Sequence, residues 1–143
     1  MKINASVRLE RLKLSNRSLE IIASHGRRFF STQSDRPTYG GPERISRFEI
    51  GRAGRLWFID KYTEKPIYVA YRRGDWRGFS DGGTLRSLVC AMADWIGGKR
   101  SDFPLEHLGP WPTWVCQGDL WGYGDDMHKV REEIKVILSG QRG

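Results

Sequence analysis

The sequence predicts an α+β fold, in which a three- to four-stranded antiparallel sheet is packed by two amphipathic helices. Apolar residues recur at helical spacing within residues 84–96 and again within residues 127–138. Between residues 47 and 72, three short runs are rich in strand-forming side chains and are separated by turn residues. With 143 residues, the chain is long enough for one domain with a hydrophobic core, so residues 1–143 are expected to form a single domain.

The first 30 residues allow more than one interpretation. Residues 2–14 place apolar side chains at alternate positions, which predicts a strand with a bulge, and a helix is the competing interpretation. These side chains are Ile3, Ala5, Val7 and Leu9. Residues 16–30 fit either a short helix that ends near Gly26 or a second strand. Residues 31–43 are rich in Gly, Pro and Ser and are expected to form a flexible loop.

The clearest β pattern is an antiparallel meander of three strands, at residues 47–50, 55–62 and 66–72. Pro66 is tolerated as the first residue of a strand, because no N–H of the ladder is lost there. Both faces of the second strand are apolar, so both are expected to be covered, one of them by the helix at 84–96. The apolar residues are Leu56 and Phe58 on one face and Trp57 and Ile59 on the other.

The helix at 84–96 is the best-defined element of the sequence. Its apolar face consists of Leu85, Leu88, Val89, Met92 and Ile96. Thr84 or Asp81 is expected to cap its start by accepting a backbone N–H. Gly97 and Gly98 are expected to supply the positive φ that ends it.

Residues 99–124 alternate Trp with Pro and Gly, which is typical of an ordered, irregular loop wrapped on the domain. The alternative is an aromatic recognition surface. Asp125 or Asp126 is then expected to cap a second amphipathic helix, and residues 140–143 to form a tail. The apolar face of this helix consists of Met127, Val130, Ile134, Ile137 and Leu138.

The charge is unevenly distributed along the chain. The formal net charge is +7, made up of +6 in residues 1–60, +4 in residues 61–100 and −3 in residues 101–143. A basic body suits nucleic acid, or an acidic or RNA-laden protein surface, as partner. Ordinary solubilising charge is the alternative explanation.

Basic and aromatic residues occur together in the predicted sheet, where they could bind phosphates and stack on bases. The densest part of this pattern is at residues 72–77. The alternative is that the rings belong to the core and that the Arg side chains lie over them. The candidate binding residues are Arg44, Arg47, Arg55, Lys61, Arg72, Arg73, Trp76 and Arg77.

No residue pattern indicates catalysis, a metal site or a cofactor. The three His and two Cys residues lack the short spacing of a metal site, and neither Cys116 nor His107 lies in a nucleophile motif. The Gly82-Gly83-Thr84 turn lacks the Lys of a phosphate-binding loop. Two cysteines without a disulfide framework indicate a reducing compartment, and no apolar run is long enough for a membrane span. We therefore expect a cytoplasmic, non-enzymatic protein.

Two resemblances bear on function. The order of three strands and a helix, from Arg44 to Ile96, resembles the DNA-binding modules of plant ethylene-response factors and of integrase arm-binding domains. Residues 55–138 resemble small accessory proteins of bacteriophages and prophages. The segments that carry this second resemblance are residues 58–63, 78–86, 109–112 and 118–124.

The phage resemblance implies a protein that blocks a host defence complex, as anti-CRISPR proteins do, or one that regulates transcription. We expect an inhibitor that binds a host defence nucleoprotein complex, such as a CRISPR effector, through the basic surface. A direct DNA- or RNA-binding regulator is the alternative. Both would act in the cytoplasm of a bacterial host.

Overall fold

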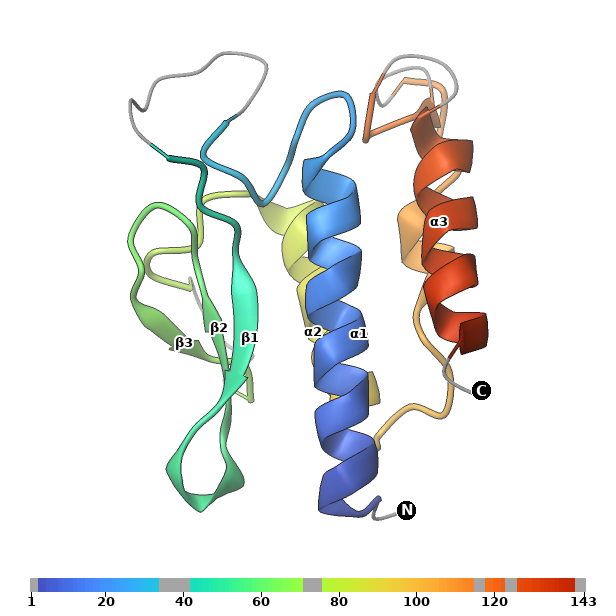
Figure 1. The fold of residues 1–143 in the computed structure, drawn as a ribbon. Coiled ribbons are helices and arrows are strands. Elements are labelled where there is room, and N and C mark those ends of the chain that lie inside the picture. Colours follow the sequence, from blue (N-terminus) through green and yellow to red (C-terminus); the bar gives the residue numbers. More distant parts are fainter. Residues whose placement is uncertain (1–2, 34–41, 71–75, 115–117, 123–125, 141–143) are drawn as a thin grey trace.

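The computed structural model describes residues 3–33, 42–70, 76–114, 118–122 and 126–140 (Figure 1). Part of the predicted loop at 31–43 and the tail residues 141–143 lie outside these residues. The helices and strands in chain order are α1 Ala5–Ala23, β1 Arg47–Ile50, the 3-10 turn η1 Arg52–Gly54, β2 Leu56–Ile59, β3 Pro66–Tyr68, α2 Gly83–Ile96, the 3-10 turn η2 Leu105–Leu108 and α3 Asp126–Gly140. The α+β class is confirmed.

The predicted meander is confirmed as an antiparallel sheet in the order β1-β2-β3. Phe48 pairs with Phe58, which pairs with Ile67, so these three apolar side chains share one face. On the opposite face, Glu49 pairs with Trp57, which in turn pairs with Tyr68. One face of the sheet is therefore apolar throughout, while the other mixes a carboxylate with two rings.

A fourth strand is absent from the described part of the chain. In its place, Ser31 and Ile45 form an isolated antiparallel bridge beside the start of β1. The N–H of Thr32 donates to the carbonyl oxygen of Arg44 at 2.9 Å, and the N–H of Ser46 donates to that of Phe30 at 2.8 Å. This bridge ties the segment after α1 to the edge of the sheet.

The predicted strand at residues 2–14 is wrong, because the structure contains one helix, α1, over the whole of 5–23. The side-chain oxygen of Asn4 accepts the N–H of Val7 at 2.8 Å and so caps the helix. The buried face includes Leu12, Ser15 and Leu19, which follow helical spacing. A serine in the middle of this face hides the helical pattern from an analysis based on apolar residues.

Helix α2 is confirmed, but its predicted cap is wrong. Its N-cap residue is Gly82, which offers no side-chain hydrogen bond. The Asp81 side chain pairs instead with Lys61, which lies between β2 and β3 in the sequence. The predicted end is confirmed, because Gly98 adopts a φ of +86°, which a non-glycine residue rarely adopts.

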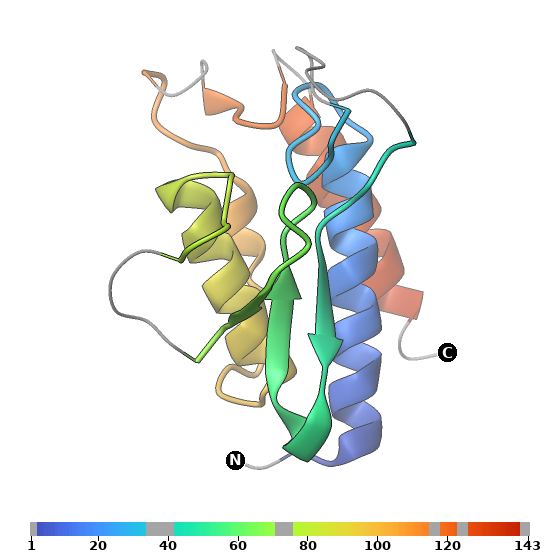
Figure 2. The same cartoon turned by 90° about the vertical axis from the view of Figure 1, so that its left-hand side faces the viewer.

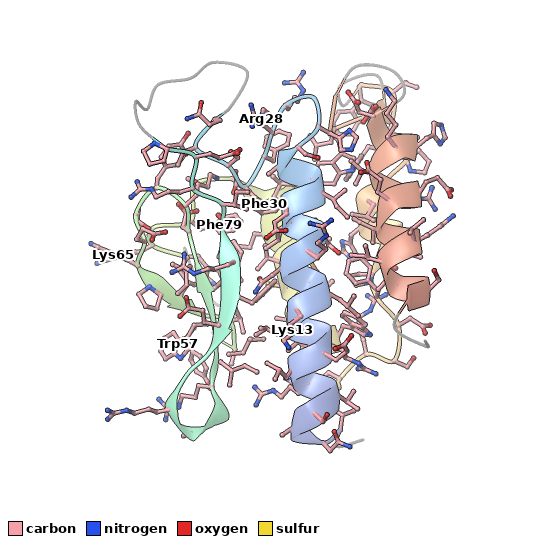
Figure 3. The ribbon with its side chains drawn as sticks, viewed as in Figure 1. Lys13, Arg28, Phe30, Trp57, Lys65 and Phe79 are labelled. Atoms are coloured by element: carbon pink, nitrogen blue, oxygen red, sulfur yellow. The ribbon has the colours of Figure 1, made fainter. Side chains whose placement is uncertain are left out.

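The molecule is built in three layers (Figure 1). The sheet forms the first layer, α1 and α2 lie side by side in the second, and α3 lies on the far side of that pair. Figure 2 shows the sheet in front of α1 and α2, which cover its apolar face. Figure 3 shows Phe30 between the sheet and α1. Phe30 packs edge-on against Phe58, with ring centroids 6.4 Å apart, and Phe48 packs against the same ring at 5.4 Å.

Helix α3 begins at Asp126, as the sequence predicts within one residue, but its capping side chain comes from elsewhere. Asp125 lies outside the described residues. One oxygen of buried Asp119 accepts the N–H of Met127 at 2.8 Å, and the other accepts the N–H of Trp121 at 3.1 Å. Asp119 thus joins the Trp-containing segment to the start of α3.

The Trp-containing segment 99–124 lies partly inside the fold. Trp121 is fully buried, and its indole N–H donates to the carbonyl oxygen of Leu108 at 2.8 Å. Trp111 packs edge-on against Trp121 at 5.1 Å, whereas Trp114 is 84% exposed. Among the described residues, none of the helices combines the length and apolar character that crossing a lipid bilayer requires.

Gly122 lies close against the side chain of Asp126, and a substitution at Gly122 tests this contact. A Cβ at this position would overlap with Oδ2 of Asp126 and would lie 2.5 Å from its Cγ and 2.7 Å from its Cβ. We expect Gly122→Ala to lower the free energy of unfolding by about 2 kcal/mol, because Asp126 and the start of α3 must move. Urea denaturation followed by circular dichroism measures the change.

Gly140→Ala is the matched control, because a Cβ at Gly140 meets nothing within 4 Å. This variant is expected to change stability by less than about 0.5 kcal/mol. Equal stabilities of the Gly122 variant and the wild type would show that the approach of Gly122 to Asp126 does not constrain the fold.

Candidate binding surface

Those predicted binding residues that the structure describes do not form one surface. Arg47 begins β1, and its guanidinium contacts two carboxylates, Glu49 at 2.6 Å and Glu64 at 3.4 Å. Partial burial lowers the pKa of Arg47, but these carboxylates outweigh that effect and raise it above its ordinary value. The charge of Arg47 is therefore largely compensated within the protein.

Lys61 and Trp76 lie in the interior, with exposed fractions of 2% and 6%. Trp76 packs edge-on against Phe79 at 5.6 Å, and the guanidinium of Arg86 lies 4.7 Å from the centroid of the Trp76 ring. The buried position of Trp76 agrees with the alternative interpretation of the sequence, in which the aromatic rings belong to the core. Neither residue contributes a side chain to an exposed basic face.

The remaining predicted residues are scattered. Arg44 is half-buried, and its N–H donates to the hydroxyl of Thr32 at 2.8 Å. Arg77 is exposed, and Arg55 is exposed at the end of the β1–β2 turn. Arg72 and Arg73 lie outside the described residues. Arg55 is therefore the predicted residue from which we build an exposed site.

Arg55 lines a groove of about 490 Å³ between the β1–β2 turn, β3 and the ends of α1 and α2. We call it the basic groove, because Arg8, Arg55 and Lys99 line it. Arg8 lies near the start of α1, whose N-cap residue is Asn4. Lys99 directly follows Gly98, whose positive φ turns the chain out of α2. Three separate elements thus bring the three cations together.

The three cations of the basic groove keep their charge available. Within the described part of the chain, none of Arg8, Arg55 and Lys99 lies within 4 Å of a carboxylate oxygen. Asp94 is the one acidic residue among the described lining residues. A concave surface with several uncompensated cations attracts an anionic partner.

An aromatic wall flanks the basic groove. Tyr68 lines the groove and is 40% exposed, and the guanidinium carbon of Arg55 lies 5.8 Å from the centroid of its ring. The ring of Trp57 lies 5.2 Å from that of Tyr68 on the same face of the sheet. Figure 3 shows Trp57 on the side of the sheet that faces away from α1. The cation of Arg55 and the rings of Tyr68 and Trp57 therefore lie close together at the end of the sheet that holds the β1–β2 turn.

Sequence reasoning missed Arg8 and Lys99. Residue 8 fell in the predicted strand, and residue 99 in the Trp-containing loop, so nothing linked either to Arg55. The excess of positive charge in residues 1–60 and 61–100 is the one available signal for Arg8 and Lys99, and it gives no position. The groove exists because the chain packs α1 and α2 against the hairpin.

The structure also assembles a buried polar cluster from two segments that the phage resemblance singled out. Nζ of Lys61 lies 2.5 Å from Oδ1 of Asp81 and donates to the hydroxyl of Ser80 at 2.8 Å. That hydroxyl donates to Asp60 at 3.0 Å, and the N–H of Ser80 does so at 3.0 Å as well. Asp60 is fully buried and Lys61 nearly so.

Burial raises the pKa of Asp81 above its ordinary value. Lys61 opposes the rise and Asp60 adds to it, while the backbone amide of Phe30 opposes it weakly. Asp81 therefore pairs with the ammonium group of Lys61, while Asp60 is linked to that group through the hydroxyl of Ser80. Such a cluster is sensitive to the loss of any one member.

Among the described residues, no group of three or more His, Cys, Asp and Glu side chains is arranged to hold a metal ion. The model of the family described as YoqU matches residues 5–139 of the chain. Comparison with curated proteins and with solved structures gives no match.

Proposed function

The chain belongs to the YoqU family, and from this premise we propose that it is a non-enzymatic, phage-type inhibitor that binds a host defence nucleoprotein complex through the basic groove. A CRISPR effector in the cytoplasm of a bacterial host is the example that we expect. The family match is consistent with a phage protein. The observation that carries the proposal is the grouping of Arg8, Arg55 and Lys99, which have no carboxylate partner among the residues that the structure describes.

The chemistry of the groove suits a nucleoprotein surface. Such a surface presents phosphates and carboxylates together, and Arg binds both through its planar, forked donors. Tyr68 and Trp57 add apolar area beside the cations, as anchors of protein interfaces commonly do. A stable interface buries about 800 Å² on each partner, so exposed residues around the groove, such as Arg52, would join the contact.

Direct binding of DNA or RNA is the second candidate, and one observation favours it. Arg55 lies over Tyr68, and Trp57 lies beside that ring, which is an arrangement on which bases stack and to which phosphates bind. Under this alternative, the nucleic acid alone is the partner and no host protein is required.

The test is an affinity pull-down from bacterial lysate, with and without nuclease, using the wild type and the triple variant Arg8→Glu, Arg55→Glu, Lys99→Glu. The proposed function predicts a stoichiometric host protein that survives nuclease treatment. Reversal of the three charges is expected to weaken its binding by at least about 100-fold, since each close charge pair contributes more than 1 kcal/mol.

The matched control reverses three cations outside the groove: Lys13→Glu, Lys65→Glu and Lys129→Glu. It has the same net charge as the first variant, so it separates the groove from overall charge. If both variants bind equally, the groove is not the binding surface. Recovery of nucleic acid alone, with an affinity that falls with salt by a log–log slope of about −3 for three phosphate contacts, would replace the inhibitor by the second candidate.

A further inference from the structure

The basic groove has an apolar surface between its cations. Figure 2 shows the β1–β2 turn, the start of α1 and the end of α2 at one end of the molecule, and these elements line the groove. The apolar lining residues, which we call the floor, are Ala53, Leu56, Val69, Ala70 and Ala93. Ala53 and Ala70 are exposed, and the other three are buried. A ligand that covers the floor with an apolar group removes this surface from water, which is favourable.

Small residues leave room above the floor. Gly54 and Gly97 line the groove together with the three alanines of the floor. A Cβ at Gly54 would lie 3.1 Å from Nη1 of Arg8, so the guanidinium of Arg8 lies directly against the β1–β2 turn. The volume of about 490 Å³ falls within the range of about 300–1,000 Å³ that is common for ligand pockets. The groove is therefore large enough for a short peptide segment with one large apolar side chain.

The three cations come from separate elements around the floor. Arg8 belongs to α1, Arg55 ends the β1–β2 turn, and Lys99 follows α2. Arg55 and Lys99 are exposed, and Arg8 is half-buried. No carboxylate oxygen of the residues that the structure describes lies within 4 Å of any of the three. Their arrangement suits a ligand that carries several anionic groups and not a single one.

The floor and the cations together favour a protein segment over a nucleic acid as the occupant of the groove. A nucleic acid would meet the cations through its phosphates, and the groups nearest to the floor would then be polar sugars and phosphates. An acidic peptide offers carboxylates to the cations and an apolar side chain to the floor. Protein interfaces commonly combine such an apolar anchor with a charged rim.

We propose that the basic groove binds an acidic segment of the partner protein. One large apolar side chain of the segment lies on the floor, beside the ring of Tyr68, and carboxylates on either side of it pair with Arg8, Arg55 and Lys99. The inference rests on the proposed function, because it names the part of the nucleoprotein complex that the groove contacts. The nucleic acid of that complex then makes no contact inside the groove.

The first experiment titrates the full chain with three blocked peptides at neutral pH, followed by amide NMR shifts and calorimetry. The first peptide is Asp-Glu-Leu-Asp-Glu, the second has Ser in place of Leu, and the third has Asn and Gln in place of Asp and Glu. The Leu peptide is expected to bind about tenfold more tightly than the Ser peptide, because only Leu covers the floor. The uncharged peptide should bind at least about tenfold more weakly than the Leu peptide. The shifted amides should belong to residues 53–56, 68–70 and 93–99.

The second experiment uses Ala70→Trp, which fills the groove above the floor and leaves the net charge unchanged. This variant is expected to bind the Leu peptide about tenfold more weakly than the wild type does, and no more tightly than the Ser peptide. Ser87→Trp is the matched control, because Ser87 is exposed on α2 and does not line the groove. It should keep the wild-type affinity for both peptides.

Equal binding of the Leu and Ser peptides by the wild type would overturn the proposal, and so would the absence of any shift at millimolar Leu peptide. Tighter binding of an oligothymidylate that carries as many charges as the Leu peptide would also overturn it, because the groove would then take nucleic acid. These results come from the wild type, so they hold even if the Ala70 variant does not fold.

The failure of this inference can be distinguished from the failure of the proposed function. If the pull-down yields a host protein that the triple charge reversal releases, but Ala70→Trp binds it as well as the wild type does, the proposed function stands and the inference fails. If the wild type prefers the Leu peptide but captures no host protein, the inference about the groove is supported and the proposed function fails.

Discussion

Replacement of Lys61 by methionine is expected to lower the free energy of unfolding by about 3–5 kcal/mol, the range found when one partner of a buried ion pair is removed. Methionine has a similar length, so the loss arises from charge more than from a cavity. Without the ammonium group, Asp81 keeps a buried charge with no counter-ion, beside the carboxylate of Asp60. Urea denaturation of the wild type and the variant measures the difference.

The destabilisation by Lys61→Met should depend on pH in a defined direction. The pKa of Asp81 is raised by burial above its ordinary value of 3.8, and the loss of Lys61 raises it further. For a carboxyl with a raised folded pKa, the stability contribution is complete below the unfolded pKa and is lost as the pH rises through the folded pKa. The variant should therefore lose more stability at about pH 7.5 than at about pH 4.5.

Two variants control this result. Lys65→Met removes an exposed lysine and is expected to change stability by less than about 0.5 kcal/mol. The double variant Lys61→Met, Asp81→Leu removes both charges and should recover part of the loss, since apolar replacement of a whole buried pair is often neutral. A loss that is the same at both pH values would show that burial of Asp81 without Lys61 is not its cause.

Replacement of Trp121 by alanine is expected to lower the free energy of unfolding by about 3–5 kcal/mol. The side chain is fully buried and packs edge-on against Phe29 and Trp111. Its removal leaves a cavity between Phe29 and Trp111, and the carbonyl oxygen of Leu108 loses its indole donor. Thermal and urea denaturation measure the loss.

Trp114→Ala is the matched control for Trp121→Ala, because the same residue type is 84% exposed there. It should leave stability within about 0.5 kcal/mol of the wild type. Trp121→Phe keeps most of the packing but removes the N–H, so it should cost about 1–3 kcal/mol and separates the hydrogen bond from the cavity. Similar stabilities of the two alanine variants would contradict the core position of Trp121.

The central helix and the meander could be predicted because their signals are local. Leu85, Leu88 and Met92 lie within two turns of each other, and Phe48 and Phe58 lie in adjacent short strands. Periodicity failed for α1, where Ser15 occupies a buried position and Ala5 and Val7 alternate as in a strand. The residues alone could not distinguish a small buried side chain from an exposed one.

The candidate sites could be predicted much less well than the fold. Residue type predicts Lys61 and Trp76 as binding residues, yet both are buried. It does not predict Arg8 and Lys99, yet they line the basic groove with Arg55. Residue type states which contacts a side chain can make, but its exposure depends on which distant segments pack over it.

The sequence by itself determined the three-stranded meander, α2, α3 and the excess of basic charge, because each follows from neighbouring residues or from composition. Only the tertiary structure decided that Asp81 pairs with Lys61 instead of capping α2, and that Asp119 caps α3. It also decided which cations keep their charge available. The physical reason is the same in each case: a side chain's hydrogen bonds and ion pairs depend on the nearest partner in space, which periodicity along the chain does not specify.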